Sequence, residues 1–169
     1  NHGGIIRLDS TPGAGTTVTL YLPAVETPTS DEGINATHET GIAVDGDRRR
    51  TVLLVDDEEM IRTTGKLMLE AAGFEAVAVA TGQAALEALQ EKTQDVDLVL
   101  LDLSMPVMDG AECFEKLREI DPTVRVVICT GHTSHKDATW MLAAGALGVL
   151  RKPFNMEQMR AALAQALAS

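Results

Sequence analysis

The feature that most constrains the fold is a regular alternation of apolar runs and amphipathic segments from Thr51 onward. Each apolar run is short and bounded by turn residues, which is typical of strands buried on both faces of a parallel sheet. Between these runs, apolar residues recur at helical spacing. The pattern predicts strands at 51–55, 74–79, 97–101, 124–130 and 147–151. It predicts helices at 58–72, 83–91, 111–120, 136–144 and 156–168.

Five strands that alternate with five helices predict an α/β fold. The expected architecture is a doubly wound parallel sheet with helices on both faces and right-handed crossovers. The chain has 169 residues, enough for one such domain with a sizeable core and additional segments.

Polar residues follow four of the predicted strands, and the carboxyl ends of parallel strands meet at one edge of a sheet. These residues are Asp56 and Asp57, Asp102, Thr130 and Gly131, and Lys152. Three carboxylates within roughly 4–6 Å repel one another by several kcal/mol at an effective dielectric near 20. A compensating cation is therefore expected, and hard oxygen ligands suit Mg²⁺ or Mn²⁺.

Asp102 follows the short apolar run of residues 98–101, and we interpret it as a nucleophile. A carboxylate that attacks phosphorus forms an acyl phosphate. Lys152, the Thr130 hydroxyl and the Gly131 backbone amide would neutralise the phosphoryl oxygens. Taken singly, an Asp in this position also serves as a helix or turn cap. The joint placement of all these residues on one edge favours the chemical interpretation.

The motifs DDEE, DLSMPVMDG, TG and KPF resemble those of the receiver domain of bacterial response regulators, and the resemblance covers 51–169. It implies a flavodoxin-like sheet with strand order 2-1-3-4-5. Asp102 would be the phosphoacceptor of a two-component system, with Lys152 paired to the phosphoryl group and Thr130 acting as a switch residue. Where the family usually has Tyr or Phe, three residues before the lysine, this chain has Val149.

The same resemblance implies the ligands of the metal site. Asp57, Asp102 and the backbone carbonyl of Ser104 would contact Mg²⁺ directly, and Asp56 would act through water. Lys152 would precede a cis-proline, Pro153.

The sequence predicts a β-hairpin at residues 1–25, in which two runs of alternating apolar and polar residues flank a Pro-Gly-Ala-Gly turn. The sequence HGGIIRLDSTPGAGTTVTLYLP resembles the last two strands of a sensor histidine kinase ATP-binding domain. The asparagine and glycine boxes of that domain are absent, so kinase activity is not expected here. Residues 26–50 read as a flexible acidic linker, with six acidic residues and no Lys or Arg between Glu26 and Asp47.

Together, the resemblance of residues 1–25 to a kinase domain and of residues 51–169 to a receiver domain implies a hybrid histidine kinase with a receiver domain at its C-terminus. The expected partners are the kinase's phosphohistidine domain, in cis or in trans, or a histidine phosphotransfer protein. A net charge of −11 argues against nucleic acid and against direct contact with an anionic membrane. No run of eighteen apolar residues is present, and two isolated cysteines fit a reducing compartment. A cytoplasmic location follows, although a parent kinase could be membrane-anchored, and homodimerisation stays open.

Other functions compatible with these residues are a phosphate sink and an interaction module that is never phosphorylated. A phosphatase with an Asp nucleophile would want a second Asp two residues later, where this chain has Ser104. Whether the domain counts as an enzyme stays open, because a receiver catalyses only its own phosphorylation and dephosphorylation.

Overall fold

The computed structural model describes residues 5–11, 15–21, 43–45, 48–91, 95–131 and 135–168. The chain divides into two compact units, residues 1–37 and 38–169, which we describe separately. In the first unit, β1 (Ile5–Thr11) pairs antiparallel with β2 (Gly15–Tyr21). Their register runs from Ile5 opposite Tyr21 to Thr11 opposite Gly15. The predicted hairpin is therefore present. Most of the predicted linker lies outside the described residues.

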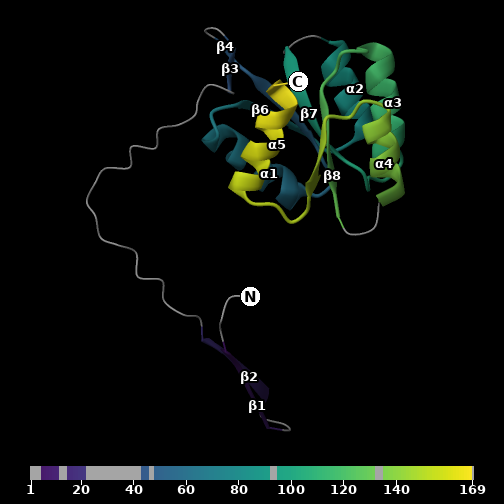
Figure 1. The fold of residues 1–169 in the computed structure, drawn as a ribbon. Coiled ribbons are helices and arrows are strands. Elements are labelled where there is room, and N and C mark those ends of the chain that lie inside the picture. Colours follow the sequence, from purple (N-terminus) through teal and green to yellow (C-terminus); the bar gives the residue numbers. More distant parts are fainter. Residues whose placement is uncertain are drawn as a thin grey trace, which may run out of the picture. The chain divides into compact units, whose positions relative to one another are not determined.

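The second unit is built on a five-stranded sheet whose neighbouring strands are all parallel (Figure 1). Its strands are β5 (Thr51–Val55), β6 (Glu75–Val79), β7 (Val96–Asp102), β8 (Val126–Thr130) and β9 (Gly148–Arg151). They lie in the order β6-β5-β7-β8-β9, which is the predicted order 2-1-3-4-5. The flavodoxin-like α/β fold is confirmed. The predicted boundaries differ most at β8, which begins at Val126 rather than at residue 124.

Helices cover both faces of this sheet (Figure 1), and the described part of the chain contains five of them. They are α1 (Glu59–Ala71), α2 (Gly82–Gln90), α3 (Gly110–Ile120), α4 (His135–Ala143) and α5 (Met156–Ala168). Alternate strand residues enter two separate cores. One core joins the strands to α2, α3 and α4 through side chains such as Leu101 and Phe114. The other joins them to α1 and α5 through Leu100 and Met159.

Local signals explain where several helices begin and end. The Thr81 side chain accepts from the Ala84 amide at 3.2 Å and caps α2, and Asp109 accepts from the Glu112 amide at 2.8 Å and caps α3. Gly73, at a φ of 95°, takes the chain out of α1. Among the described residues, no helix has the length and apolar character needed to cross a bilayer.

A short hairpin precedes the first strand of the sheet. It consists of β3 (Val44–Asp45) and β4 (Arg48–Arg49), and it comes at the end of the segment that the sequence predicts to be a linker. Ala43 is completely buried, and its carbonyl accepts from the Arg50 amide at 2.7 Å. The chain is thus packed against the domain eight residues earlier than the sequence predicts, because a small apolar residue fits into the α1–α5 core.

This hairpin is held to the start of β7 by an ion pair. Both terminal nitrogens of Arg48 donate to the Asp97 carboxylate, at 3.0 and 2.8 Å. The same carboxylate accepts from the Thr51 backbone amide at 2.7 Å. The hydrogen bond and charge of Asp97 raise the pKa of Arg48. Through Asp97, the incoming chain is joined to both β5 and β7.

On the face of the sheet opposite α1 and α5, α4 packs against α3. The ring of Trp140 meets Phe114 edge-on, with 6.1 Å between centroids and an interplanar angle of 86°. Arg118 lies 5.8 Å from the centre of the Phe114 ring and donates to the Ala144 carbonyl at the end of α4. Trp140 is therefore a packing residue that stays partly exposed.

Candidate functional site

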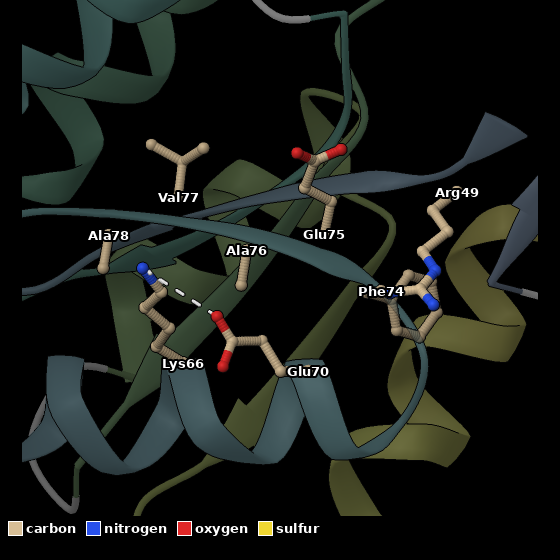
Figure 2. Close-up of a pocket in the computed structure, with 8 residues that line it drawn as sticks. All are labelled: Arg49, Lys66, Glu70, Phe74, Glu75, Ala76, Val77 and Ala78. Carbon is tan, nitrogen blue, oxygen red and sulfur yellow. Dashed lines mark ion pairs between the residues drawn. The ribbon is translucent and has the colours of Figure 1, made fainter.

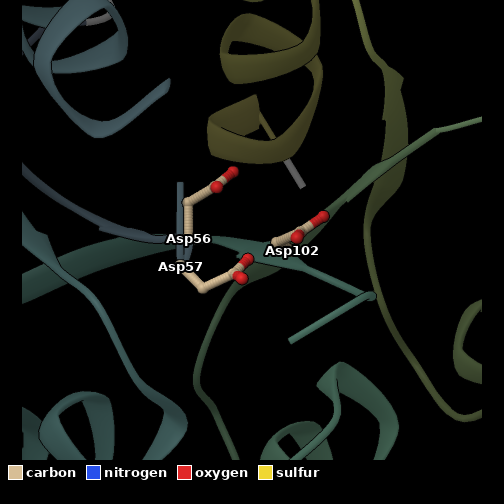
Figure 3. A group of neighbouring side chains, drawn as sticks. All are labelled: Asp56, Asp57 and Asp102. Atoms are coloured by element: carbon tan, nitrogen blue, oxygen red, sulfur yellow. The ribbon is translucent and has the colours of Figure 1, made fainter. Parts of the chain in front are cut away.

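Three carboxylates meet at the carboxyl edge of the central strands (Figure 3). Asp56 and Asp57 follow β5 directly, and Asp102 is the last residue of the neighbouring β7. One ligand oxygen from each of them lies within 4.8 Å of the others. The predicted convergence of these residues is thus a feature of the structure.

The three differ in their access to water. Asp56 is completely buried and Asp102 is 4% exposed, whereas Asp57 is exposed. Asp56 Oδ1 accepts from the Glu58 amide at 3.0 Å, which holds this side chain in the turn before α1. The cluster therefore consists of two buried carboxylates, Asp56 and Asp102, and one carboxylate, Asp57, that is open to solvent.

Lys152 supplies the positive charge of the site. It follows β9, and its Nζ lies 2.5 Å from Asp56 Oδ2 and 2.9 Å from Asp102 Oδ1. The peptide bond to Pro153 is cis, as the family resemblance implies. The Lys152 amide donates to the Thr130 carbonyl at 2.8 Å, which joins the lysine backbone to the end of β8. The lysine side chain reaches both buried carboxylates.

The ionisation of this group reflects burial and pairing together. Burial raises the pKa of Asp102, while the hydrogen bond and charge of Lys152 oppose that shift. Burial on its own lowers the pKa of Lys152, but its bonds to Asp56 and Asp102 outweigh this, so its pKa is raised. Lys152 stays protonated at neutral pH, and its charge favours the ionised form of Asp102 against the effect of burial.

Other predicted residues lie around this cluster without joining the ion pairs. Thr130 ends β8 beside Asp102, and its hydroxyl donates to the Gly131 carbonyl at 3.1 Å. Gly131, directly after β8, and Ser104, two residues after β7, are both exposed. Val149 packs partly buried against the core that includes α4.

One residue of the site has no counterpart in the sequence-based prediction. Arg62, one turn into α1, donates from Nη1 to the carbonyls of Asp56 and Asp57, at 2.8 and 2.6 Å. The guanidinium fixes the backbone of the acidic turn without touching the carboxylates. A helical cation five residues after a pair of acids is a weak signal, because most such side chains are solvated.

The loop from β7 to α3 lies against the phosphoacceptor candidate. The Gly110 amide donates to the Leu103 carbonyl at 3.0 Å, and a Cβ on Gly110 would lie 2.4 Å from the Asp102 carbonyl oxygen. Only glycine allows this approach. The steric requirement therefore explains the glycine at the start of α3.

The residues present fit a magnesium ion. The donor set consists of hard carboxylate oxygens, which Mg²⁺ prefers, and the exposed Asp57 leaves one side open for the waters that Mg²⁺ retains. Lys152 pairs with Asp56 and Asp102 but not with Asp57, so the cluster keeps an excess of negative charge. A divalent cation would offset that excess.

A hollow of about 820 Å³ lies elsewhere, along the outer strand β6 and α1 (Figure 2). Its lining includes Arg49, Phe74 and the Lys66–Glu70 ion pair at 3.8 Å. None of the clustered carboxylates lines it. The candidate functional site is therefore identified by its clustered charged side chains and not by this hollow.

The parallel sheet, its strand order and an acidic cluster with a lysine define a flavodoxin-like receiver. Residues 52–164 match the family model of the response regulator receiver domain. The chain belongs to this family.

Among curated proteins, the sensor kinase CckA of Brucella abortus is 34% identical over 160 residues, which cover 93% of this chain and 17% of the kinase. The nitrate/nitrite response regulator NarL of Escherichia coli is 37% identical over 120 residues, which cover 70% of this chain and 55% of that protein. The chain thus spans only part of the length of these relatives.

Solved structures give the same result. A receiver domain protein from Clostridium thermocellum aligns with a TM-score of 0.67 and 28% identity, covering 70% of this chain and 94% of that one. The receiver domain of the sensor histidine kinase PA1611 from Pseudomonas aeruginosa aligns with a TM-score of 0.63 and 27% identity. That alignment covers 71% of this chain and 98% of the other, whose structure has a magnesium ion in its active site cleft.

Proposed function

We propose that this domain accepts a phosphoryl group from a phosphohistidine on Asp102 and relays it as a signal. The observation that carries the proposal is the buried Asp102 carboxylate, paired with Lys152 and adjoining two further carboxylates. In the transfer, the N–P bond of the donor breaks and an O–P bond to Asp102 forms. The imidazole leaves with the electron pair of the broken bond.

Each site residue has a role in this proposal. Asp57, Asp102 and the Ser104 carbonyl would hold Mg²⁺ directly and Asp56 through water. The bound ion would supply positive charge for the phosphoryl oxygens. Lys152 and the Gly131 amide stabilise two of those oxygens. Thr130 is the switch residue: its hydroxyl, which donates to the Gly131 carbonyl here, turns to the phosphoryl group once the group is attached.

We also propose that the chain comes from a hybrid histidine kinase that acts in the cytoplasm. The alignment with the sensor kinase covers 93% of the chain, more than residues 52–164 alone could supply. The hairpin of β1 and β2 fits the last strands of a kinase ATP-binding domain. Its partners are then the kinase's phosphohistidine domain or a separate phosphotransfer protein.

The experiment is intact-mass measurement after incubation with Mg²⁺ and acetyl phosphate. We expect one added phosphoryl group, which is lost with EDTA and in Asp102→Asn. Glu115→Gln, an exposed acid on α3, is the matched control and should be labelled like the wild type. Absence of both adduct and released phosphate would contradict the proposal and favour an interaction module. Released phosphate without an adduct would indicate rapid hydrolysis, as in a phosphate sink.

A further inference from the structure

Strand β6 forms one edge of the five-stranded sheet, and the described part of the chain places no strand on its outer side. On its inner side, the amide of its first residue, Glu75, donates to the Arg50 carbonyl at 2.9 Å. Because the backbone groups of successive strand residues point in opposite directions, Ala76 and Ala78 direct their N–H and C=O groups outward. The edge thus offers two donors and two acceptors to another strand.

This edge lacks the features by which proteins usually protect an edge strand. Its sequence, Glu-Ala-Val-Ala-Val, contains no Pro and no Lys, and its pairing with β5 has no bulge. Residues 74–78 line the hollow of about 820 Å³ beside α1 (Figure 2). At the opposite edge of the sheet, β9 has only four residues and carries the exposed Arg151. The open edge at β6 is therefore a template for a strand of another molecule.

The charged side chains beside this edge balance one another. Two cations, Arg49 and Lys66, and two anions, Glu70 and Glu75, line the hollow, whereas the whole chain has a net charge of −11. Lys66 Nζ lies 3.8 Å from Glu70 Oε1, one turn further along α1. Two copies of so acidic a chain repel each other, and the repulsion is smallest where the facing surfaces carry both signs.

We propose that β6 is an interface between two copies of this chain, in which the two β6 strands pair antiparallel about a two-fold axis at Val77. Ala76 of each copy then lies opposite Ala78 of the other, and each of these two pairs exchanges two N–H···O=C bonds. The carboxyl ends of the two sheets point in opposite directions, so the acidic cluster of each copy stays open. The inference is independent of the proposed function.

The side chains on both faces of the joined sheet fit this arrangement. On one face, Val77 meets Val77 of the second copy in an apolar cross-strand pair. On the other face, Ala76 and Ala78 are small, and the hollow above them leaves room between the two α1 helices. Figure 2 shows Lys66 on the side of Ala78 and Glu70 on the side of Ala76. Lys66 of each copy therefore faces Glu70 of the other, which gives two crossed ion pairs.

Sedimentation velocity of the full chain measures the association. Between about 1 µM and about 500 µM we expect a reversible dimer with a Kd on the order of 50 µM, since an edge contact is small for a specific interface. Ala78→Pro removes an outward donor in each copy and no bond to β5, so it should raise the Kd at least about tenfold. Its Tm shows whether the variant is folded.

Charge reversal tests the crossed ion pairs without touching the strand. Lys66→Glu and Glu70→Lys should each raise the Kd about tenfold, because like charges then face each other across the axis. An equimolar mixture of these two variants should dimerise about as well as the wild type, since opposite charges face each other again. Lys116→Glu is the matched control, because it makes the same charge change in an exposed ion pair of 2.7 Å on α3. It should leave the Kd unchanged within about twofold.

Several outcomes would overturn the inference. One is a wild type that stays monomeric over the whole range. Slow hydrogen exchange of the Ala76 and Ala78 amides in such a monomer would mean that other residues of the same chain cover the edge. A dimer that tolerates Ala78→Pro and both charge reversals would place the contact on another surface. Charge-reversed variants that stay monomeric when mixed would exclude the crossed ion pairs and with them the two-fold register.

Discussion

Lys152 Nζ lies closer to Asp56 than to Asp102, at 2.5 Å against 2.9 Å. The completely buried carboxylate thus holds the lysine firmly, and Asp102 shares it. If Asp102 accepts a phosphoryl group as proposed, Lys152 could turn toward the new oxygens while its bond to Asp56 keeps it in place. The same cation would then serve the site before and after the transfer.

Excess negative charge at the site should make one of its acids destabilising. Asp57 is exposed and has no share in the Lys152 ion pairs, so Asp57→Asn removes repulsion without leaving a buried charge alone. In EDTA we expect this variant to be more stable by about 1 kcal/mol, or about 3 °C in Tm. Thermal unfolding with and without Mg²⁺ measures the effect.

The response to Mg²⁺ completes that prediction. If the cluster binds Mg²⁺ as proposed, saturating Mg²⁺ should raise the Tm of the wild type, because a ligand that binds the folded state stabilises it. It should raise the Tm of Asp57→Asn much less, and that of Glu115→Gln as much as in the wild type. An equal Mg²⁺ response in Asp57→Asn would remove Asp57 from the ligands.

The close approach at Gly110 should make it intolerant of a side chain. In Gly110→Ala the new Cβ would lie 2.4 Å from the Asp102 carbonyl oxygen and 2.7 Å from Leu103 Cα, so backbone must move. We expect a loss of about 2–4 kcal/mol in the free energy of unfolding, measured in urea. Gly148→Ala is the control, because its Cβ would meet nothing within 4 Å. Equal losses in the two variants would contradict the steric explanation.

The ion pair at the start of β7 should stabilise the whole domain. Asp97→Asn removes the charge that Arg48 binds and weakens the acceptor of the Thr51 amide. A loss of about 1–2 kcal/mol is expected, larger than for most surface ion pairs because the Asp97 side chain is only 13% exposed. Asp95→Asn, an exposed neighbour, should change the stability by less than about 0.5 kcal/mol. Similar losses of stability in Asp97→Asn and Asp95→Asn would mean that negative charge near Arg48 matters and not the specific ion pair with Asp97.

Two buried thiols should make stability fall in alkaline solution. Burial raises the pKa of Cys113 to about 11 and that of Cys129 to about 12, from 9.0. The unfolded chain loses these protons first, so stability is unaffected below pH 9 and decreases as the pH rises toward 11. The decrease approaches about 1.4 kcal/mol per thiol and pH unit.

Urea unfolding between pH 8 and 10.5 measures this slope, which should be shallower in Cys129→Ala. At pH 8, a thiol reagent should react with the native protein far more slowly than with the unfolded chain. Rapid modification of both native thiols at pH 8 would show that they are not protected.

The alternation of apolar runs predicts the central fold well because both periodicities are strong. The buried strand at 51–55 contains only apolar residues after Thr51, and charged residues, Arg50 and Asp56, lie at its two ends. The edge chemistry is predictable for a related reason: parallel strands bring their carboxyl ends together wherever the individual side chains point. Asp56, Asp57, Asp102 and Lys152 could thus be grouped from the sequence.

What the sequence did not predict depends on side chains that act over long distances. The anchoring of Arg48 by Asp97 spans 49 residues, and no periodicity marks it. Arg62 acts on backbone carbonyls, and an arginine on an amphipathic helix is ordinarily solvated. The positive φ of Val107, 71°, lies between two methionines of the core, Met105 and Met108, and no local sequence pattern marks it.

Strand β7 carries the Arg48 anchor near its beginning and the phosphoacceptor candidate at its end. Asp97 and Asp102 are five residues apart, which in a strand is about 16 Å. The hairpin of β3 and β4 is therefore held at the edge of the sheet opposite the acidic cluster. A change in charge at Asp102 would leave the Arg48–Asp97 ion pair outside its immediate surroundings, so the two ends of β7 can differ in what they contact without disturbing each other.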